Sequence, residues 1–257
     1  MLIAQISDSH FLVPPGRLAG RFETAAAFER LMGSLANLAV RPDLILFSGD
    51  LGELATREEY FAIGQGLRRL EVPVLAVPGN HDLREPMWSE LGDMLGRTED
   101  GFLCVSDDRF PMAVIGLDTL VEGEPHGELC RSRLAWLEAQ LEKARGMPAL
   151  LFMHHPPLQT GLEAMDRIGL RSGAAELERF IRAHGGVQAI LCGHMHRAIQ
   201  GQLGGVPVRV APSVSHQIAF DIRDGEPYRF SDEPPQFMMH LWQPGSGFVS
   251  HVVPVNG

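Results

Sequence analysis

Short apolar runs alternate with stretches of helical periodicity from the N-terminus to His196. The apolar runs span residues 2–7, 44–48, 74–77, 113–117, 149–153 and 189–192. Each is apolar at consecutive positions, which is typical of a strand covered on both faces. Apolar residues recur at helical spacing over residues 22–38, 56–70, 131–145 and 172–184. Thr56 and Glu59 form a capping-box pattern at the start of the second helical stretch. The alternation predicts an α/β fold with ligand-bearing loops beyond the carboxyl ends of the strands.

The pattern of residues changes after His196. Glycine and proline interrupt short β-like runs, such as 206–211 and 237–242, and no long helical pattern follows. We therefore expect a core of residues 1–203 and a β-rich segment of residues 204–235 that serves as a cap or as a contact in a dimer or higher homo-oligomer. Residues 236–257 are predicted to return to the core as strands.

Composition narrows the classes of protein. With 257 residues, of which 45% are hydrophobic and 21% charged, the chain can bury a core as one large domain. A formal net charge of -10 without a basic run argues against binding of a nucleic-acid polymer. Because no apolar stretch reaches the roughly 20 residues that span a bilayer, we expect no membrane insertion. The N-terminus lacks the features of a secretory signal, and three cysteines without CxxC spacing suggest neither disulfides nor a thiolate zinc site. A cytoplasmic location is expected.

Candidate ligands for metal ions follow five of the predicted strands. They are Asp8-Ser9-His10, Gly49-Asp50, Gly79-Asn80-His81-Asp82, His154-His155 and Gly193-His194-Met195-His196. In an extended segment residues i and i+2 point the same way, so Asp8 and His10 can hold one cation. The two oxygens of Asp50 can bridge a pair of metals. Each motif alone is also compatible with an ordinary turn. Five such motifs, each directly after a strand, favour a shared metal site.

This ordered set of motifs resembles the calcineurin-like metallophosphoesterase superfamily. The resemblance implies a four-layer αββα sandwich, in which two mixed sheets are flanked by helices, with residues 1–203 as the catalytic core. It also implies two divalent or mixed-valence metal ions, drawn from Fe, Mn, Zn or Co. By this resemblance Asp8, His10 and His196 would hold one ion, and Asn80, His154 and His194 the other. Asp50 would bridge the two.

Residues 2–11, 77–82 and 152–157 are most similar to bacterial class III cyclic-nucleotide phosphodiesterases and glycerophosphodiesterases. The resemblance implies hydrolysis of a small phosphodiester, either a 3',5'-cyclic nucleotide or a glycerophosphodiester, through attack by metal-bound hydroxide. His81 would stabilise the phosphoryl oxygens or protonate the leaving oxygen, and Asp82 would orient the His81 ring. Asn80, His81 and His216 would contact the substrate.

Several alternatives stay open at this stage. The same metal core could serve a phosphomonoesterase or protein phosphatase, for which Arg17, Arg21 and Arg84 are candidate phosphate contacts. A non-catalytic interaction scaffold would predict lost ligands, and the complete ligand set argues against it. Asp82 could instead cap a turn, and His155 is expected to pack or bond beside the site without ligating.

Overall fold

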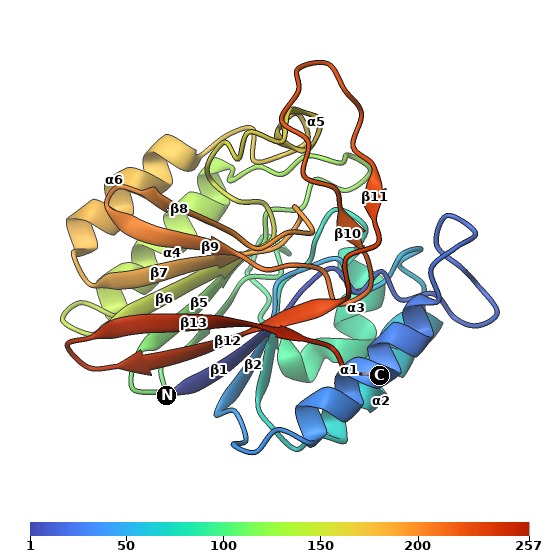
Figure 1. Ribbon diagram of the computed structural model, residues 1–257. Helices are drawn as coiled ribbons and strands as arrows, with labels where there is room; N and C mark the ends of the chain where they lie inside the picture. The colour runs from blue at the N-terminus through green and yellow to red at the C-terminus, as the bar shows by residue number, and fades with distance from the viewer. Residues whose placement is uncertain (257) are drawn as a thin grey trace.

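Two mixed β-sheets lie face to face, with helices on both outer surfaces (Figure 1). The computed structural model describes residues 1–256. The first sheet has the strand order β13-β12-β1-β2-β3. Its strands are β1 (Leu2–Ile6), β2 (Leu44–Phe47), β3 (Val74–Ala76), β12 (Gln236–Gln243) and β13 (Gly247–Pro254). β1, β2 and β3 are parallel, whereas β12 and β13 join antiparallel.

The second sheet has six strands, in the order β4-β5-β6-β7-β9-β8. Its strands are β4 (Val105–Asp107), β5 (Ala113–Leu117), β6 (Ala149–Met153), β7 (Val187–Cys192), β8 (Ile199–Leu203) and β9 (Val206–Val210). β5, β6, β7 and β9 run parallel, and the two edge strands β4 and β8 are antiparallel to their neighbours.

Helices cover the outer face of each sheet. The helices are α1 (Thr24–Ala36), α2 (Arg57–Arg68) and α3 (Arg84–Leu91), followed by the short η1 (Gly92–Met94), beside the first sheet, and α4 (Arg131–Lys143), α5 (Glu163–Asp166) and α6 (Ala174–His184) beside the second. At the start of α2, Thr56 and Glu59 form the predicted capping box. The expected αββα sandwich is therefore confirmed.

Both faces of the central strands are buried, as their continuous apolar sequences predict. Along β1, Ile3 packs between the two sheets, while Ala4 and Ile6 pack against the helices. Phe152 and Leu191 meet Ile3 in the same inter-sheet core. Shifting a strand by one residue would exchange the side chains of its two faces and disrupt the close packing of both cores. The double burial therefore holds the strand ends in place.

The residues between β9 and β12, 211–235, lie over the carboxyl ends of the central strands and are called the covering segment. The strand β9 belongs to the second sheet, so the predicted cap of residues 204–235 is divided between this sheet and the covering segment. The remainder carries the small antiparallel pair β10 (Gln217–Ile218) and β11 (Phe230–Ser231). The loop joining them extends away from the sheets beside α5 (Figure 1). Within residues 1–256 no helix is both long and apolar enough to cross a membrane.

Candidate metal centre

The strand ends bring the predicted ligands together from positions far apart in the chain. Asp8 and His10 follow β1, Asp50 follows β2, and His196 lies beyond β7. One ligand atom from each of these four residues lies within 4.8 Å of the others. Asn80 follows β3, and its Oδ1 lies 3.1 Å from His154 Nε2 and 3.1 Å from His194 Nδ1. All seven residues predicted as ligands therefore meet in one place.

Hydrogen bonds to main-chain carbonyls fix which ring nitrogen of two histidines faces this cluster. His154 Nδ1 lies 2.8 Å from the Ser48 carbonyl oxygen, and His196 Nδ1 lies 3.0 Å from the His216 carbonyl oxygen. A carbonyl oxygen only accepts hydrogen bonds, so Nδ1 of each ring is the donor. In a neutral imidazole the other nitrogen, Nε2, then presents a lone pair. Both Nε2 atoms point into the cluster, where each can offer its lone pair to a cation in place of a proton.

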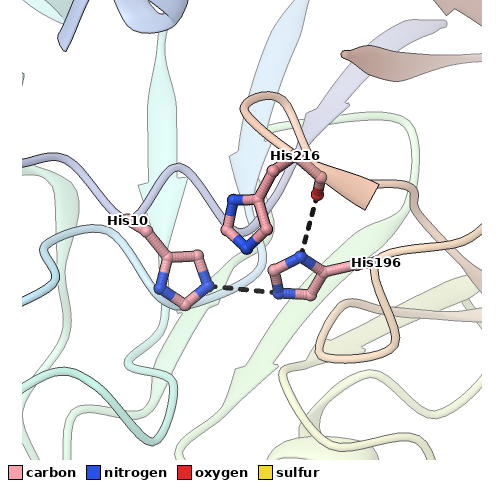
Figure 2. Close-up of side chains that lie close together, drawn as sticks. All are labelled: His10, His196 and His216. Carbon is pink, nitrogen blue, oxygen red and sulfur yellow. Dashed lines mark hydrogen bonds between the residues drawn. The ribbon is translucent and has the colours of Figure 1, made fainter. Parts of the chain in front are cut away.

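Ring nitrogens and acceptor oxygens face one another at short distances in this cluster. His10 Nε2 lies 3.1 Å from His196 Nε2 (Figure 2). His154 Nε2 lies 3.3 Å from Asp50 Oδ2, and the same nitrogen faces the Asn80 amide oxygen. His194 Nε2 is buried and has no hydrogen-bond partner within residues 1–256. Bound cations would satisfy such a set of converging acceptors, and imidazole nitrogens with carboxylate and amide oxygens suit Fe, Mn, Zn or Co. The residues present thus fit two metal ions.

The backbone at these ligands is held in an uncommon conformation. Five of the seven have a positive φ: Asp8 (56°), His10 (44°), Asp50 (52°), His194 (71°) and His196 (49°). Left-handed conformations at residues other than glycine cost free energy and persist where the surrounding structure imposes them, often at functional sites. The glycines of the motifs allow close approach, because a Cβ at Gly49 would collide with the His154 ring and one at Gly79 with the Asp50 carboxylate.

The two aspartates are ionised although they are buried. Burial alone would raise the pKa of Asp8, but the charge and hydrogen bond of His196 hold that pKa below its ordinary value. Burial likewise opposes ionisation of Asp50, and His154 and His81 hold its pKa well below the usual range. Burial lowers the pKa of His194 to about 3, so this ring is neutral. Burial acts to lower the pKa of His154, but the charge of Asp50 and the hydrogen bond to it raise the pKa to about 9, so without metal His154 Nε2 carries a proton that a cation would displace. The cluster therefore offers carboxylates and at least one imidazole that is already neutral, the forms that bind metal.

His81 lies at the rim of this cluster, where its side chain is partly exposed. Its main-chain N–H donates to Asp50 Oδ1 at 2.8 Å, and its ring Nδ1 lies 3.1 Å from Glu53 Oε2. Burial acts to lower the pKa of His81, but the charges of Asp50 and Glu53 outweigh it and raise the pKa to about 10. The His81 ring is therefore a proton donor that opens toward solvent.

Asp82 does not take the orienting position that the sequence suggested. Its carboxylate accepts hydrogen bonds from the main-chain N–H groups of Leu51, Gly52 and Gly79 and from the Tyr60 hydroxyl. These bonds fasten the turn after β3 to the loop after β2, so Asp82 acts as a turn cap. Glu53 bonds the His81 ring in its place. Glu53 was not predicted from the sequence, because this residue belongs to none of the motifs. The only available signal was its position, three residues after Asp50.

His216 joins the site from the covering segment. Its ring is buried, bonds Ser215 Oγ through Nδ1 at 2.8 Å and stacks on Phe22. The ring centroid lies 4.5 Å from that of His196 and 5.1 Å from that of His10 (Figure 2). His155 bonds Thr119 Oγ1 through Nδ1 at 2.8 Å, and its ring centroid lies 4.5 Å from that of His194. This bond agrees with the expected position of His155 beside the site, and the absence of ligation by His155 stays a prediction.

A pocket opens directly above the cluster. Its floor contains His10, Asp50, Glu53, Asn80, His81, His194, His196 and His216, and its wall contains Leu18, Met165, Ile168, Ile218, Tyr228 and Phe230. No arginine or lysine within residues 1–256 lines this pocket. Arg84 instead binds Asp118 at 2.7 Å, and Arg17 and Arg21 form ion pairs with Glu23 and Asp232.

Two stacked mixed sheets, with histidine, aspartate and asparagine ligands gathered at the strand ends, are the architecture of a metallophosphoesterase. The model of the calcineurin-like phosphoesterase family matches residues 1–198, and the chain belongs to this family.

Known proteins similar to this chain support the same assignment. A probable glycerophosphodiester phosphodiesterase of Arcobacter nitrofigilis is 35% identical over 252 residues, which are 98% of this chain and 92% of the relative. The 3',5'-cyclic adenosine monophosphate phosphodiesterase of Escherichia coli K12 is 29% identical over 84% of this chain and 76% of its own length. Among solved structures, a dimetal phosphatase from Danio rerio has a TM-score of 0.65 at 15% identity, with 99% of both chains covered. At 15% identity, the likeness to the Danio rerio structure shows a shared fold only.

Proposed function

We propose that this protein is a dinuclear-metal-dependent phosphodiesterase that hydrolyses a small phosphodiester. The observation that carries the proposal is the position of the Asp50 carboxylate at the strand ends. It lies between the group that contains His10 and the group that contains His154. Relatives named as glycerophosphodiester and cyclic-nucleotide phosphodiesterases, which this chain matches over most of its length, support the reaction class.

In this proposal Asp8, His10 and His196 hold one ion, and Asn80, His154 and His194 hold the other. Asp50 contributes to both, since its Oδ2 lies 3.5 Å from His10 Nε2 and 3.3 Å from His154 Nε2. Two such ions, when bound, supply a water of lowered pKa as nucleophile and positive charge for the phosphate oxygens. This ligand set accepts Fe, Mn, Zn or Co, and metal availability selects among them.

The chain's own residues bind the substrate and move the proton. His81 Nδ1 is occupied by Glu53, so Nε2 is the nitrogen free to donate a proton to a phosphoryl oxygen or to the leaving oxygen. Asn80 and His216 line the same pocket and are proposed as further substrate contacts. Burial of His216 lowers the pKa of its ring far below the ordinary value, which makes it a neutral contact.

The pocket walls favour a diester over a monoester. A phosphomonoester carries close to two negative charges at neutral pH and a diester carries one. Without arginine or lysine in the pocket described above, less positive charge is available for a doubly charged substrate. The apolar wall, which includes Tyr228 and Phe230, can accommodate the second ester group. A 3',5'-cyclic nucleotide and a glycerophosphodiester both meet these requirements.

The test compares two chromogenic substrates. Protein reconstituted with Mn²⁺ should hydrolyse bis-p-nitrophenyl phosphate with a higher kcat/KM than p-nitrophenyl phosphate. Preference for the monoester would contradict the diesterase assignment, and no turnover of either by protein that holds two ions would contradict catalysis. Comparing 3',5'-cyclic AMP with glycerophosphoethanolamine under matched metal loading would then define the substrate. Homo-oligomerisation through residues 204–235 and a cytoplasmic location stay predictions.

A further inference from the structure

We propose that Glu53 is a positioning residue that holds both the ligand His10 and the proton donor His81 through one carboxylate oxygen. The inference rests on the metal centre proposed above. Glu53 Oε2 lies 2.7 Å from His10 Nδ1 and 3.1 Å from His81 Nδ1. The two rings meet edge to face, with centroids 4.6 Å apart. One side chain therefore contacts both the metal centre and the group that faces the substrate.

The contact with His10 determines which of its nitrogens is available to a metal. Nδ1 donates its hydrogen to the Glu53 carboxylate, because an ionised carboxylate only accepts. Nε2 then carries the lone pair, and this is the nitrogen that lies 3.1 Å from His196 Nε2 and 3.5 Å from Asp50 Oδ2. A carboxylate behind a ligating imidazole fixes the orientation of its ring and increases its basicity.

His10 differs in this respect from the other histidines of the centre. The distal nitrogens of His154 and His196 bond neutral main-chain carbonyls, and the Nε2 of His194 has no partner within residues 1–256. A charge-assisted hydrogen bond is roughly twice as strong as a neutral one. The metal affinity of the half-site of Asp8, His10 and His196 therefore depends on the Glu53 side chain, which is not itself one of the seven ligands.

The contact with His81 orients the second ring. With Nδ1 held by Glu53 and the main-chain N–H bonded to Asp50, His81 is anchored at two points. Its ring lines the pocket, so Nε2 is the nitrogen left to reach a substrate. Losing the Glu53 contact would free the ring to rotate about its side-chain torsions and would lower the fraction of rings in the productive orientation.

Glu53 is itself held firmly enough for this role. Its main-chain N–H donates to the Phe11 carbonyl at 3.2 Å, and the Phe11 N–H donates to Leu51 O at 3.0 Å. These bonds join the loop after β1, which carries His10, to the loop after β2, which carries Asp50. The Glu53 side chain is 17% exposed. Its position is therefore set by the backbone and not by the two histidines alone.

Metal titration of Glu53→Ala, Glu53→Gln and the control Glu58→Ala tests the inference. Glu58 is an exposed residue in the first turn of α2, only five positions away. The affinity for each Mn²⁺ is measured by competition with a chromophoric chelator, alongside kcat and KM at saturating metal. We expect Glu53→Ala to weaken one of the two ions on the order of 10–100-fold, the range seen when such a partner is removed, and to leave the other unchanged.

Two further readouts separate positioning from a structural role. At saturating Mn²⁺, Glu53→Ala should have a lower kcat than the wild type and nearly the same KM, because the His81 ring is no longer held. Glu53→Gln retains an oxygen that can accept both hydrogen bonds and should recover part of both losses. Glu58→Ala should match the wild type in every measurement.

The possible failures are distinct. If the wild type does not bind two Mn²⁺ ions, the proposed metal centre itself is wrong. If the wild type binds two and Glu53→Ala has unchanged affinities and kcat, the role of Glu53 is overturned while the centre stands. Equal weakening of both ions, together with a lower unfolding temperature of the metal-free variant, would also overturn it, because Glu53 would then be a structural residue only.

Discussion

The strand-end cluster and the β10–β11 loop of the segment that covers it are built in opposite ways. In the cluster, charged and imidazole groups are buried, and five ligands have left-handed backbone conformations. In the covering segment, residues 211–218 are buried, but in the loop that follows β10, Phe220, Ile222 and Tyr228 are 66%, 58% and 49% exposed, and the ion pairs of Asp221 lie at the surface. The contrast teaches that the chemistry is placed where packing over-determines the chain, while the loop between β10 and β11, which carries part of the pocket wall, is held by few buried contacts.

The largest expected effect is that of Asp50→Ala, which removes the carboxylate shared by both half-sites. Two-metal catalysis contributes several kcal/mol of charge stabilisation, so kcat should fall on the order of 10³-fold or more. The measurement is kcat on bis-p-nitrophenyl phosphate with excess Mn²⁺. Asp100→Ala, at an exposed position, is the matched control and should keep its activity. A kcat within tenfold of the wild type in Asp50→Ala would remove the bridging role.

His81→Ala should reduce kcat by about 10²-fold, the lower end of the range for a side chain that transfers a proton. Metal affinity should stay unchanged, because the ring faces the pocket and bonds Glu53, not the ligand cluster. His251→Ala, at an exposed position on β13, serves as the control. A variant that lost a metal ion but kept full activity per loaded molecule would show that His81 belongs to the centre and not to the proton transfer.

Removal of metal should destabilise the cluster more than the covering segment. Ions that bind only the folded chain stabilise it by about 2.7 kcal/mol at a free concentration 100 times their Kd. Unfolding in urea with Mn²⁺ and with a chelator should differ by that order. Hydrogen exchange should locate the loss of protection at the loops after β1, β2 and β7. Identical unfolding curves in both conditions would mean that no ion binds the folded protein.

The smallest effect should come from Phe230→Ala in the covering segment. Loss of one aromatic wall residue should cost about 1–3 kcal/mol of substrate binding, seen as a KM raised roughly tenfold, with kcat within about twofold. Phe220→Ala lies in the same segment, outside the pocket lining, and should leave KM unchanged. A fall in kcat as large as that of His81→Ala would place the covering segment in the catalytic machinery and erase the contrast between the two regions.

Much of the fold could be predicted because the central strands are buried on both faces. Strands 113–117 and 149–153 match β5 and β6 at both ends, and the helix predicted at 131–145 matches α4 within two residues. The helix α3 (Arg84–Leu91) had no prediction, since half of its residues are polar and its apolar periodicity is weak. The position of β9 between β7 and β8 depends on long-range pairing, which local periodicity does not encode.

The candidate site could be anticipated where ligand types follow strands directly, as at Asp8 and His10. All seven predicted ligands lie together in the structure, although their binding of metal is still a proposal. The contacts around them could not be anticipated. Asp82 bonds main-chain groups while Glu53 bonds the His81 ring, and the choice between two nearby carboxylates depends on loop conformation, not on spacing.

The number of metal ions per chain tests the central claim most directly. Elemental analysis of protein reconstituted with Mn²⁺ and freed of unbound metal should give two ions per chain in the wild type and at most one in Asp50→Ala. Fewer than two ions in the wild type, or two in both proteins, would contradict a centre in which Asp50 joins two cations.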